Sequence, residues 1–197
     1  MHEFALDLAK LWSIECDGAR PSRRRRLAVW LLRSELHCVA AFRFGRFADA
    51  VRARHPFWGA APVAAHRMWN RWITGIHHCD ISRHARIGGG MLLMHRHGVL
   101  IGPAVIGRNS VIHHNVTIGQ RVAGGERGLP HIGDNVWIGP GAIITGAITV
   151  GDGATISAGA VVSRDVPSRS LVAGNPGRVI AHDYDNRAML NFVLPRD

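Results

Sequence analysis

Several kinds of residue and segment are scarce in this sequence of 197 residues, and each scarcity excludes a class of protein. Lysine occurs once, as Lys10, so the other cationic residues are arginines. The formal net charge of +10 invites a nucleic-acid interpretation. Arginine bias alone can produce such a charge, and we therefore expect no nucleic-acid partner. No apolar run approaches the length of a bilayer span, so no stable membrane insertion is expected.

Cysteines and targeting signals are equally sparse. Cys16, Cys38 and Cys79 are odd in number and widely spaced, without a C-x-x-C pair or a disulfide framework. This spacing is typical of free thiols in a reducing compartment. The first residues also lack the basic start and apolar core of a signal peptide. Together these features predict a cytoplasmic protein.

What the sequence does contain is an aliphatic residue at every sixth position. The clearest run is Ile132, Ile138, Ile144, Val150, Ile156 and Val162, each followed by a small or turn-forming residue. A period of six fits neither an isolated helix nor a hairpin meander. It fits a flat-sided coil in which each short strand contributes one aliphatic side chain to a central stack.

The same spacing extends upstream, with two irregular steps. Leu100, Ile106, Ile112 and Ile118 form one run, and Ile81, Ile87 and Leu93 form an earlier one. The step from Leu93 to Leu100 is seven residues, and the step from Ile118 to Ile132 is fourteen. Extra residues must leave the coil as loops, where functional residues tend to lie.

The segment before the repeats predicts helices. Apolar spacing indicates helices over residues 3–16, 27–54 and 57–73. The run Arg23–Arg26 reads as a solvated helix start or linker, with a phosphate contact or an anionic membrane as alternatives. The aromatic, arginine-rich helices fit a membrane surface, but packing on the coils and on a neighbouring subunit is the simpler interpretation. We expect a helical region at 1–75, coils at 76–180 beginning after Gly75, and a tail at 181–197 that caps them.

Several segments of the coils resemble a known family. They are Asp80-Ile-Ser-Arg-His-Ala-Arg-Ile-Gly88, His95-Arg-His-Gly98, Asn115-Val-Thr-Ile-Gly119, Asn135-Val-Trp-Ile-Gly139 and Ala173-Gly-Asn-Pro-Gly-Arg-Val-Ile180. Together with the repeats they resemble the hexapeptide-repeat acyltransferases, most closely the serine acetyltransferase group and its sugar-acetylating relatives. The resemblance implies a mainly β fold, a left-handed parallel β-helix, with an N-terminal helical region and a short C-terminal tail.

Acyl transfer from a thioester to an alcohol requires a base that takes the hydroxyl proton, and a positioned imidazole is suited to this. His95 is the best candidate, because it lies in the seven-residue step and resembles the catalytic histidine of the serine acetyltransferases. His114 follows nineteen residues later, one coil plus one residue, so it should lie near His95 and orient it or bind acceptor. His113 and His97 are weaker candidates for substrate contact.

Two departures from the serine acetyltransferases bear on the acceptor. Where that group has an aspartate that helps hold serine, this sequence has Met94. The loop from Gln120 to Pro130 lacks the second active-site histidine of that group, and its Glu126 and Arg127 are assigned to the acceptor pocket instead. These departures favour a sugar or another hydroxylated metabolite as acceptor, with serine O-acetylation in cysteine synthesis as the alternative.

The resemblance also implies a donor site. Acetyl-CoA, or another acyl-CoA, would be the co-substrate in a groove between neighbouring β-helices, so a homotrimer is implied, with a dimer of trimers as a further option. The matching positions are Gly139, Pro140, Ala158, Ser163, Arg164 and Arg178. The small residues also fit plain coil corners, whereas the arginines suit phosphate groups. Trp137 is interpreted as a contact between subunits rather than a ligand platform.

Two other functions remain open. A γ-type carbonic anhydrase shares the fold and binds zinc through three histidines, to which His95 and His114 could belong. The expected His-x-x-x-x-His pair is missing, because position 119, five residues after His114, is Gly119, so no metal is expected. A non-catalytic scaffold is the other alternative, but it has no need for the Gly-Asn-Pro ending.

Overall fold

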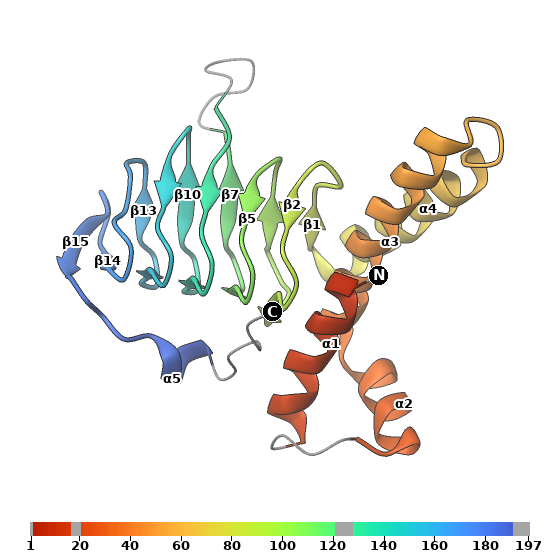
Figure 1. The fold of residues 1–197 in the computed structure, drawn as a ribbon, viewed down its shortest axis with the longest axis horizontal. Helices are drawn as coiled ribbons and strands as arrows, with labels where there is room; N and C mark the ends of the chain where they lie inside the picture. The colour runs from red at the N-terminus through yellow and green to blue at the C-terminus, as the bar shows by residue number, and fades with distance from the viewer. Residues whose placement is uncertain (1, 17–20, 121–127, 191–197) are drawn as a thin grey trace.

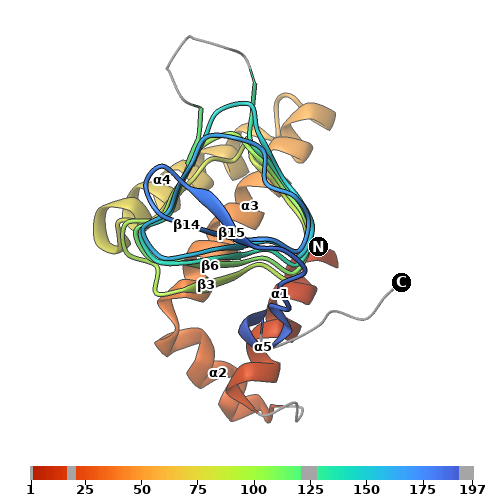
Figure 2. The same cartoon turned by 90° about the vertical axis from the view of Figure 1, so that its left-hand side faces the viewer.

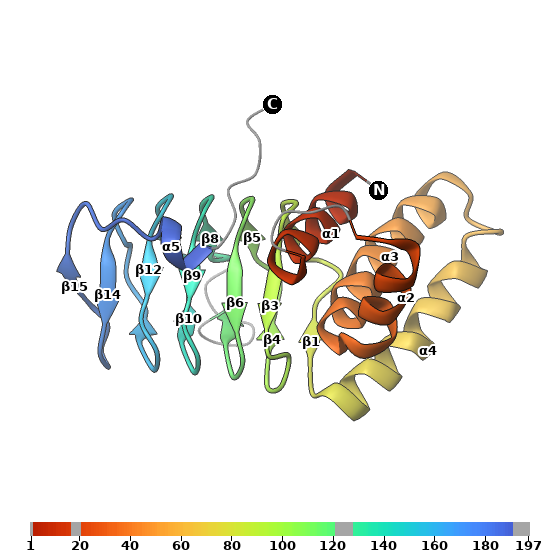
Figure 3. The same cartoon turned by 90° about the horizontal axis from the view of Figure 1, so that it is seen from below.

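A computed structural model describes residues 2–16, 21–120 and 128–190. Four helices come first, then a stack of short strands, then a short tail (Figure 1). The helices gather at the N-terminal end of the stack, and the strands continue away from them as successive coils (Figures 1 and 3).

The strands form the three flat sides of a parallel coil. Sheet A has the order β1-β4-β7-β10-β13, sheet B has β11-β8-β5-β2, and sheet C has β15-β14-β12-β9-β6-β3. Every strand pair is parallel except β14–β15. Each coil adds one strand to each sheet in turn, and the five strands of sheet A correspond to five coils. The view along the axis shows their triangular outline (Figure 2). The expected parallel β-helix is confirmed.

The strand bounds show how short each side of the coil is. Sheet A comprises β1 (Asp80–Ile81), β4 (Leu100–Ile101), β7 (Thr117–Gly119), β10 (Ile143–Thr145) and β13 (Val161–Val162). Sheet B comprises β2 (Arg86–Ile87), β5 (Val105–Ile106), β8 (His131–Ile132) and β11 (Thr149–Val150). Sheet C comprises β3 (Leu92–Met94), β6 (Val111–His113), β9 (Trp137–Ile138), β12 (Thr155–Ile156), β14 (Leu171–Ala173) and β15 (Arg178–Ala181).

Each coil places one aliphatic side chain per sheet on the axis, and these side chains form three buried columns. The columns are Ile81, Ile101, Ile118, Ile144 and Val162 in sheet A, Ile87, Ile106, Ile132, Val150 and Val166 beside sheet B, and Leu93, Ile112, Ile138, Ile156 and Val172 in sheet C. Truncating one such isoleucine to alanine would cost about 2–5 kcal/mol, because the neighbouring coils cannot collapse into the space.

One predicted member of this stack is wrong. Leu100 is 54% exposed on the outer face of β4, whereas Ile101 is 1% exposed and pairs with Ile118 in the column. Counted through Ile101, the steps from Leu93 and to Ile106 are eight and five residues. Counted through Leu100, they are seven and six. Adjacent residues of a strand face opposite sides, so a corner with two extra residues decides which of two aliphatic neighbours points inward.

The helices also differ from the prediction at three boundaries. The elements are α1 (His2–Glu15), α2 (Arg23–Leu32), α3 (Ser34–Arg54) and α4 (Ala60–His77). The expected helix from Leu27 to Arg54 is broken at Arg33, which has an extended backbone. The expected helix from Phe57 begins at Ala60 instead. It continues through Gly75, so the coils start at Asp80.

Contacts between α1 and α2 explain the break at Arg33. The Arg33 guanidinium bonds to the Glu15 carboxylate, and the Arg26 guanidinium lies 5.0 Å from the Trp12 ring centroid. Arg25 donates to the Glu15 carbonyl oxygen at 3.2 Å. The chain therefore turns so that α2 can lie against α1. Within the Arg23–Arg26 run, two arginines make contacts inside this chain.

Charged side chains join α1 and α3 to the first coils. Lys10 Nζ donates to the carbonyl oxygen and Oδ1 of Asn109, at 3.1 and 2.7 Å. Arg43 donates from Nε to Asp7 Oδ2 at 2.8 Å and from Nη1 to the Ile87 carbonyl oxygen at 2.6 Å. Burial lowers the pKa of Lys10 to about 7, although the Asp7 carboxylate opposes this shift. Burial also raises the pKa of Asp7, against the effect of Arg43. The helical region is thus fixed to the coils by desolvated charges.

The outer face of sheet C is covered by α1 and by the tail (Figures 2 and 3). Leu11 and Ile14 of α1 and Leu190 of α5 (Arg187–Leu190) pack with Leu92 and Val111 on this face. The tail was predicted to cap the end of the coils. In the structure β15 pairs with the terminal strand β14, and the following chain returns along the side of sheet C. Residues Phe192 and Val193 of the predicted tail lie outside the described residues.

The corners between sheets C and A lie directly above one another. Gly98 N donates to His78 O at 2.9 Å, Gly141 N to His114 O at 3.0 Å, and Gly159 N to Pro140 O at 2.8 Å. Gly98 has a φ of +69°, and a Cβ placed on it would lie 2.1 Å from Asn115 Oδ1. This corner therefore requires glycine.

Replacing Lys10 with methionine should change how stability depends on pH. The pKa of Lys10 rises from about 7 in the folded chain towards 10.5 on unfolding, so the unfolded chain binds more protons in that window. Between pH 7 and 10.5 the free energy of unfolding of the native protein should therefore rise with pH more steeply than that of the variant. Urea unfolding of both proteins across this range measures the difference in slope. Equal slopes would contradict the prediction.

Replacing Gly98 with alanine should lower the free energy of unfolding by about 1–3 kcal/mol, because of the left-handed backbone and the contact with Asn115. Gly119→Ala is the matched control, since a Cβ there meets nothing within 4 Å. Urea midpoints of the two variants and the native protein provide the measurement. A loss at Gly98→Ala no larger than the loss at Gly119→Ala would show that the left-handed backbone and the Asn115 contact add no cost.

Candidate active site

Two imidazoles meet at the first corners between sheets C and A. Met94 of β3 pairs with His113 of β6, so His95 and His114 follow on neighbouring coils. Their ring centroids are 5.8 Å apart, with the rings nearly perpendicular. His95 is exposed and has a φ of +63°, while His114 is half-buried. The predicted proximity of these two histidines is therefore observed.

A third imidazole and an indole adjoin this pair. The ring of His113 lies 6.5 Å from that of His114 and 4.8 Å from that of Trp137. Burial, and then the neighbouring His114 and His95, lower the pKa of His113. His113 is therefore neutral near pH 7, which limits the positive charge at the corner. Trp137 packs within this chain against the cluster of Leu92, Val111 and Leu190, so within the described residues it has an intramolecular role.

The chemistry of this corner follows from the exposure of its nitrogens. His95 is open to solvent, so an approaching hydroxyl can reach its ring. His114 Nδ1 is buried and has no hydrogen-bond partner among the described residues. A buried unpaired nitrogen costs free energy, so a function at this site is a reason to retain it. An exposed imidazole supported by a second one is a suitable arrangement for taking a proton from an alcohol.

Contacts from the helical region hold the His95 corner, and sequence reasoning missed them. Arg96 Nη1 lies 3.6 Å from Glu35 Oε1 of α3, and both side chains are 19% exposed. The backbone of Gly98 is bonded to His78, the C-cap of α4. Burial, and then the charge of Arg96, lower the pKa of His77. Glu35 precedes Arg96 by 61 residues, and no motif links them.

The residues assigned to the donor fall on two different edges. Gly139, Pro140 and Ala158 lie in the column of corners that continues from His95 and His114. Arg178 belongs to β15 and pairs with Ala173, just before the last of these corners. Four coil steps of about 4.8 Å give a track of roughly 19 Å from the imidazoles to this end.

Ser163 and Arg164 do not join that track. They follow β13 of sheet A, so they lie at a corner between sheets A and B. His97 is exposed at the same corner as His95. Glu126 and Arg127, assigned to the acceptor pocket, lie outside the described residues. Within residues 2–16, 21–120 and 128–190, no group of three or more His, Cys, Asp or Glu side chains is arranged to hold a metal ion.

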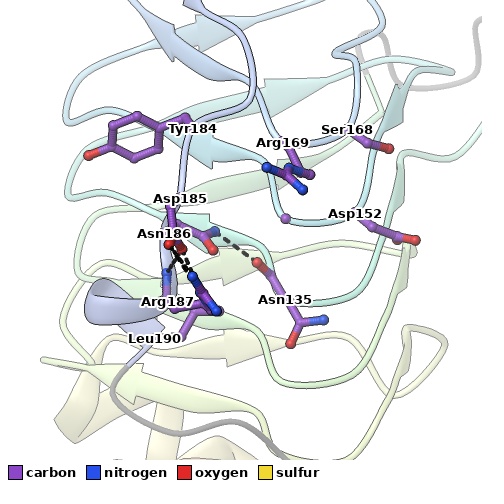
Figure 4. Close-up of a pocket in the computed structure, with 10 residues that line it drawn as sticks. Asn135, Asp152, Ser168, Arg169, Tyr184, Asp185, Asn186, Arg187 and Leu190 are labelled. Carbon is purple, nitrogen blue, oxygen red and sulfur yellow. Dashed lines mark hydrogen bonds and ion pairs between the residues drawn. The ribbon is translucent and has the colours of Figure 1, made fainter.

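The cavity of about 570 Å³ at the opposite edge has a different character (Figure 4). The tail forms it against the corners between sheets B and C, and Asn186 Nδ2 donates to Asn135 O at 2.9 Å. Its two arginines pair locally: Arg187 with Asp185 at 2.6 Å, and Arg169 with Asp183 at 3.7 Å. No histidine is among its lining residues. The imidazole corner is therefore the better candidate for catalysis.

Comparison with known proteins identifies relatives of this chain. The family model described as bacterial transferase hexapeptide (six repeats) matches residues 130–164. Serine acetyltransferase 1, chloroplastic, of Arabidopsis thaliana is 43% identical over 149 residues, which are 75% of this chain and 47% of that protein. The serine acetyltransferase of Helicobacter pylori is 34% identical over 164 residues, covering 83% of this chain and 91% of that protein. The chain spans about half the length of the plant relatives that it matches.

Solved structures agree with the sequence relatives. Soybean serine acetyltransferase complexed with serine matches with a TM-score of 0.72 and 32% identity, covering 91% of this chain and 68% of that one. Serine acetyltransferase from Brucella abortus in complex with coenzyme A matches with a TM-score of 0.72 and 29% identity, covering 92% and 67%. With its β-helix, its corner histidines and these relatives, the chain belongs to the hexapeptide-repeat acyltransferases of serine acetyltransferase type.

Proposed function

We propose that this chain is an acetyl-CoA-dependent O-acetyltransferase with L-serine as acceptor. The observation that carries the proposal is the His95–His114 pair at the start of the corner track, in a chain whose relatives are serine acetyltransferases. The sequence alone favoured a saccharide acceptor. The relatives support serine better, because one neighbouring structure is titled as a complex with serine.

In the proposed mechanism His95 acts as the general base. Its ring takes the proton of the acceptor hydroxyl as the hydroxyl oxygen attacks the thioester carbonyl carbon. Backbone N–H groups at the corner stabilise the negative charge on the carbonyl oxygen. When the C–S bond breaks, the imidazolium returns the proton to the CoA sulfur. His114 lies beside His95 and keeps its ring in position.

Acetyl-CoA lies along the corner track in this proposal. Gly139, Pro140 and Ala158 leave room for the pantetheine arm, and Arg178 meets the phosphates at the far end. Ser163 and Arg164 lie on another edge, so only a neighbouring copy brings them to the same donor. We therefore include a homotrimer in the proposal. Exposed Leu100 and Ile143 on the outer face of sheet A support a contact between copies there.

A second acceptor class is favoured by one observation. Met94 stands directly before His95 and packs among apolar side chains, at the position where the resemblance to the serine acetyltransferases implies an aspartate that helps hold serine. An uncharged hydroxylated molecule, such as a sugar, would not need that carboxylate. The arrangement of the imidazoles suits both acceptors equally, so activity measured with a panel of acceptors is needed to distinguish serine from a sugar.

Replacing His95 with alanine should lower acceptor-dependent kcat by about 10²–10⁴-fold, because the hydroxyl loses its base. Thiol release from acetyl-CoA is measured with L-serine and with a panel of sugars. His131→Ala, an exposed histidine in β8, is the control and should keep its activity. Circular dichroism and CoA binding should be unchanged in both variants. Unchanged turnover in His95→Ala would remove this residue from the mechanism.

Replacing Met94 with aspartate should raise kcat/KM for L-serine by roughly tenfold, since a charge-assisted bond to the ammonium group is added. The same variant serves as its own control, because kcat/KM for an uncharged acceptor should not rise. If the values for L-serine and for sugars change together, residue 94 does not face the acceptor's ammonium group. Turnover with sugars and none with L-serine in the native protein would establish the second acceptor class.

A further inference from the structure

The outer face of α4 is an exposed apolar stripe. We use this name for Ala61, Ala65, Met68, Trp72 and Ile76, which recur at steps of four and three residues and are all exposed. Met68, Trp72 and Ile76 are 76%, 50% and 53% exposed, although side chains of this size are usually covered. Their spacing places them on one side of the helix.

The stripe is separate from the face by which α4 folds against the rest of the chain. His66 and Ile73 lie on the inner face and are buried. Gly45 of α3 lets the two helices approach closely, since a Cβ there would lie 2.4 Å from His66 Nε2. The α3–α4 packing is thus already complete. Figure 3 shows α4 along the outer edge of the helical region, with the coils beyond α3.

The charged residues of α4 itself are positive, although the exposed Asp80 borders the same cavity as Arg67 and Arg71. Arg67 and Arg71 are exposed beside it on the same helix. The segment 50–79 contains four arginines and no aspartate or glutamate. At the start of the helix, Phe57 and Trp58 are 82% and 78% exposed. An apolar stripe with aromatic residues and flanking arginines is typical of a helix that lies flat in the interface of an anionic bilayer.

We propose that the outer face of α4 docks on an anionic lipid surface. The apolar side chains enter the interfacial region, and Arg67 and Arg71 pair with the lipid headgroup phosphates. No helix among the described residues is long and apolar enough to cross a membrane. A second copy is a poorer occupant, because two such helices would bring their arginines together, and α4 carries no Asp or Glu to pair with them.

This orientation also has a consequence for the candidate active site. The C-terminal end of α4 is the end that contacts the His95 corner, through the bond from Gly98 N to His78 O. Docking of α4 therefore brings that corner near the lipid surface, and leaves the far coils with β15 away from the helical end of the stack (Figure 1).

The test is co-sedimentation of the full chain with phosphatidylcholine vesicles, with and without phosphatidylglycerol. Binding should require phosphatidylglycerol and weaken as salt is added. Arg67→Gln/Arg71→Gln should weaken binding by roughly thirtyfold, since each arginine near an anionic surface contributes a factor of about five. Met68→Ser/Trp72→Ser/Ile76→Ser should abolish it. Circular dichroism of each variant checks that the fold is kept.

Matched controls come from the opposite end of the molecule. Arg169→Gln/Arg187→Gln removes the same charge, and Ile180→Ser removes an exposed apolar side chain; both should bind vesicles like the native protein. Absence of binding to phosphatidylglycerol vesicles, or an equal loss in the controls, would overturn the proposal. Sedimentation velocity without lipid gives a further outcome: if the triple serine variant forms smaller oligomers than the native protein, the stripe is an interface between copies and the proposal is wrong.

Discussion

Each coil can turn its three sides only if one aliphatic side chain per side fills the axis, and the position of every corner depends on that stack. Parallel pairing of β4, β7 and β10 keeps Ile101, Ile118 and Ile144 in one column. Once the columns are fixed, corner residues nineteen positions apart, such as His95 and His114, meet without a motif that joins them. The site is therefore a consequence of how the core is built.

The helical region covers the N-terminal end of the first coil, which no further coil covers. Buried Arg43 and Asp7 are 8% and 2% exposed at their side chains, and removing one member of such a pair costs about 3–5 kcal/mol. The same region reaches the candidate site through Glu35 and Arg96. Folding of the helices and positioning of the His95 corner are thus coupled through short contacts at one end of the coils. This coupling gives the helices a role in the site, in addition to the docking role proposed for α4.

The acceptor and the donor edge show what the sequence left open. Met94 and the loop without a histidine favoured a saccharide, whereas the relatives support serine. Ser163 and Arg164 matched donor positions by sequence, yet they lie at a different corner from His114 and Pro140. A sequence match identifies a residue, but it does not show which copy of the chain contributes that residue to a given site. A site formed between protomers therefore cannot be assigned from one chain.

The sequence by itself determined the β-helix, because a six-residue period is a local consequence of strand length and corner size, and it was sufficient to pair His95 with His114. It did not determine whether Leu100 or Ile101 faces the axis, since both are aliphatic and only the path of the widened corner decides. Nor did it determine the break at Arg33 or the contact of Arg96 with Glu35. Those depend on side chains far apart in the chain, which only the packed helices and coils bring within reach of one another.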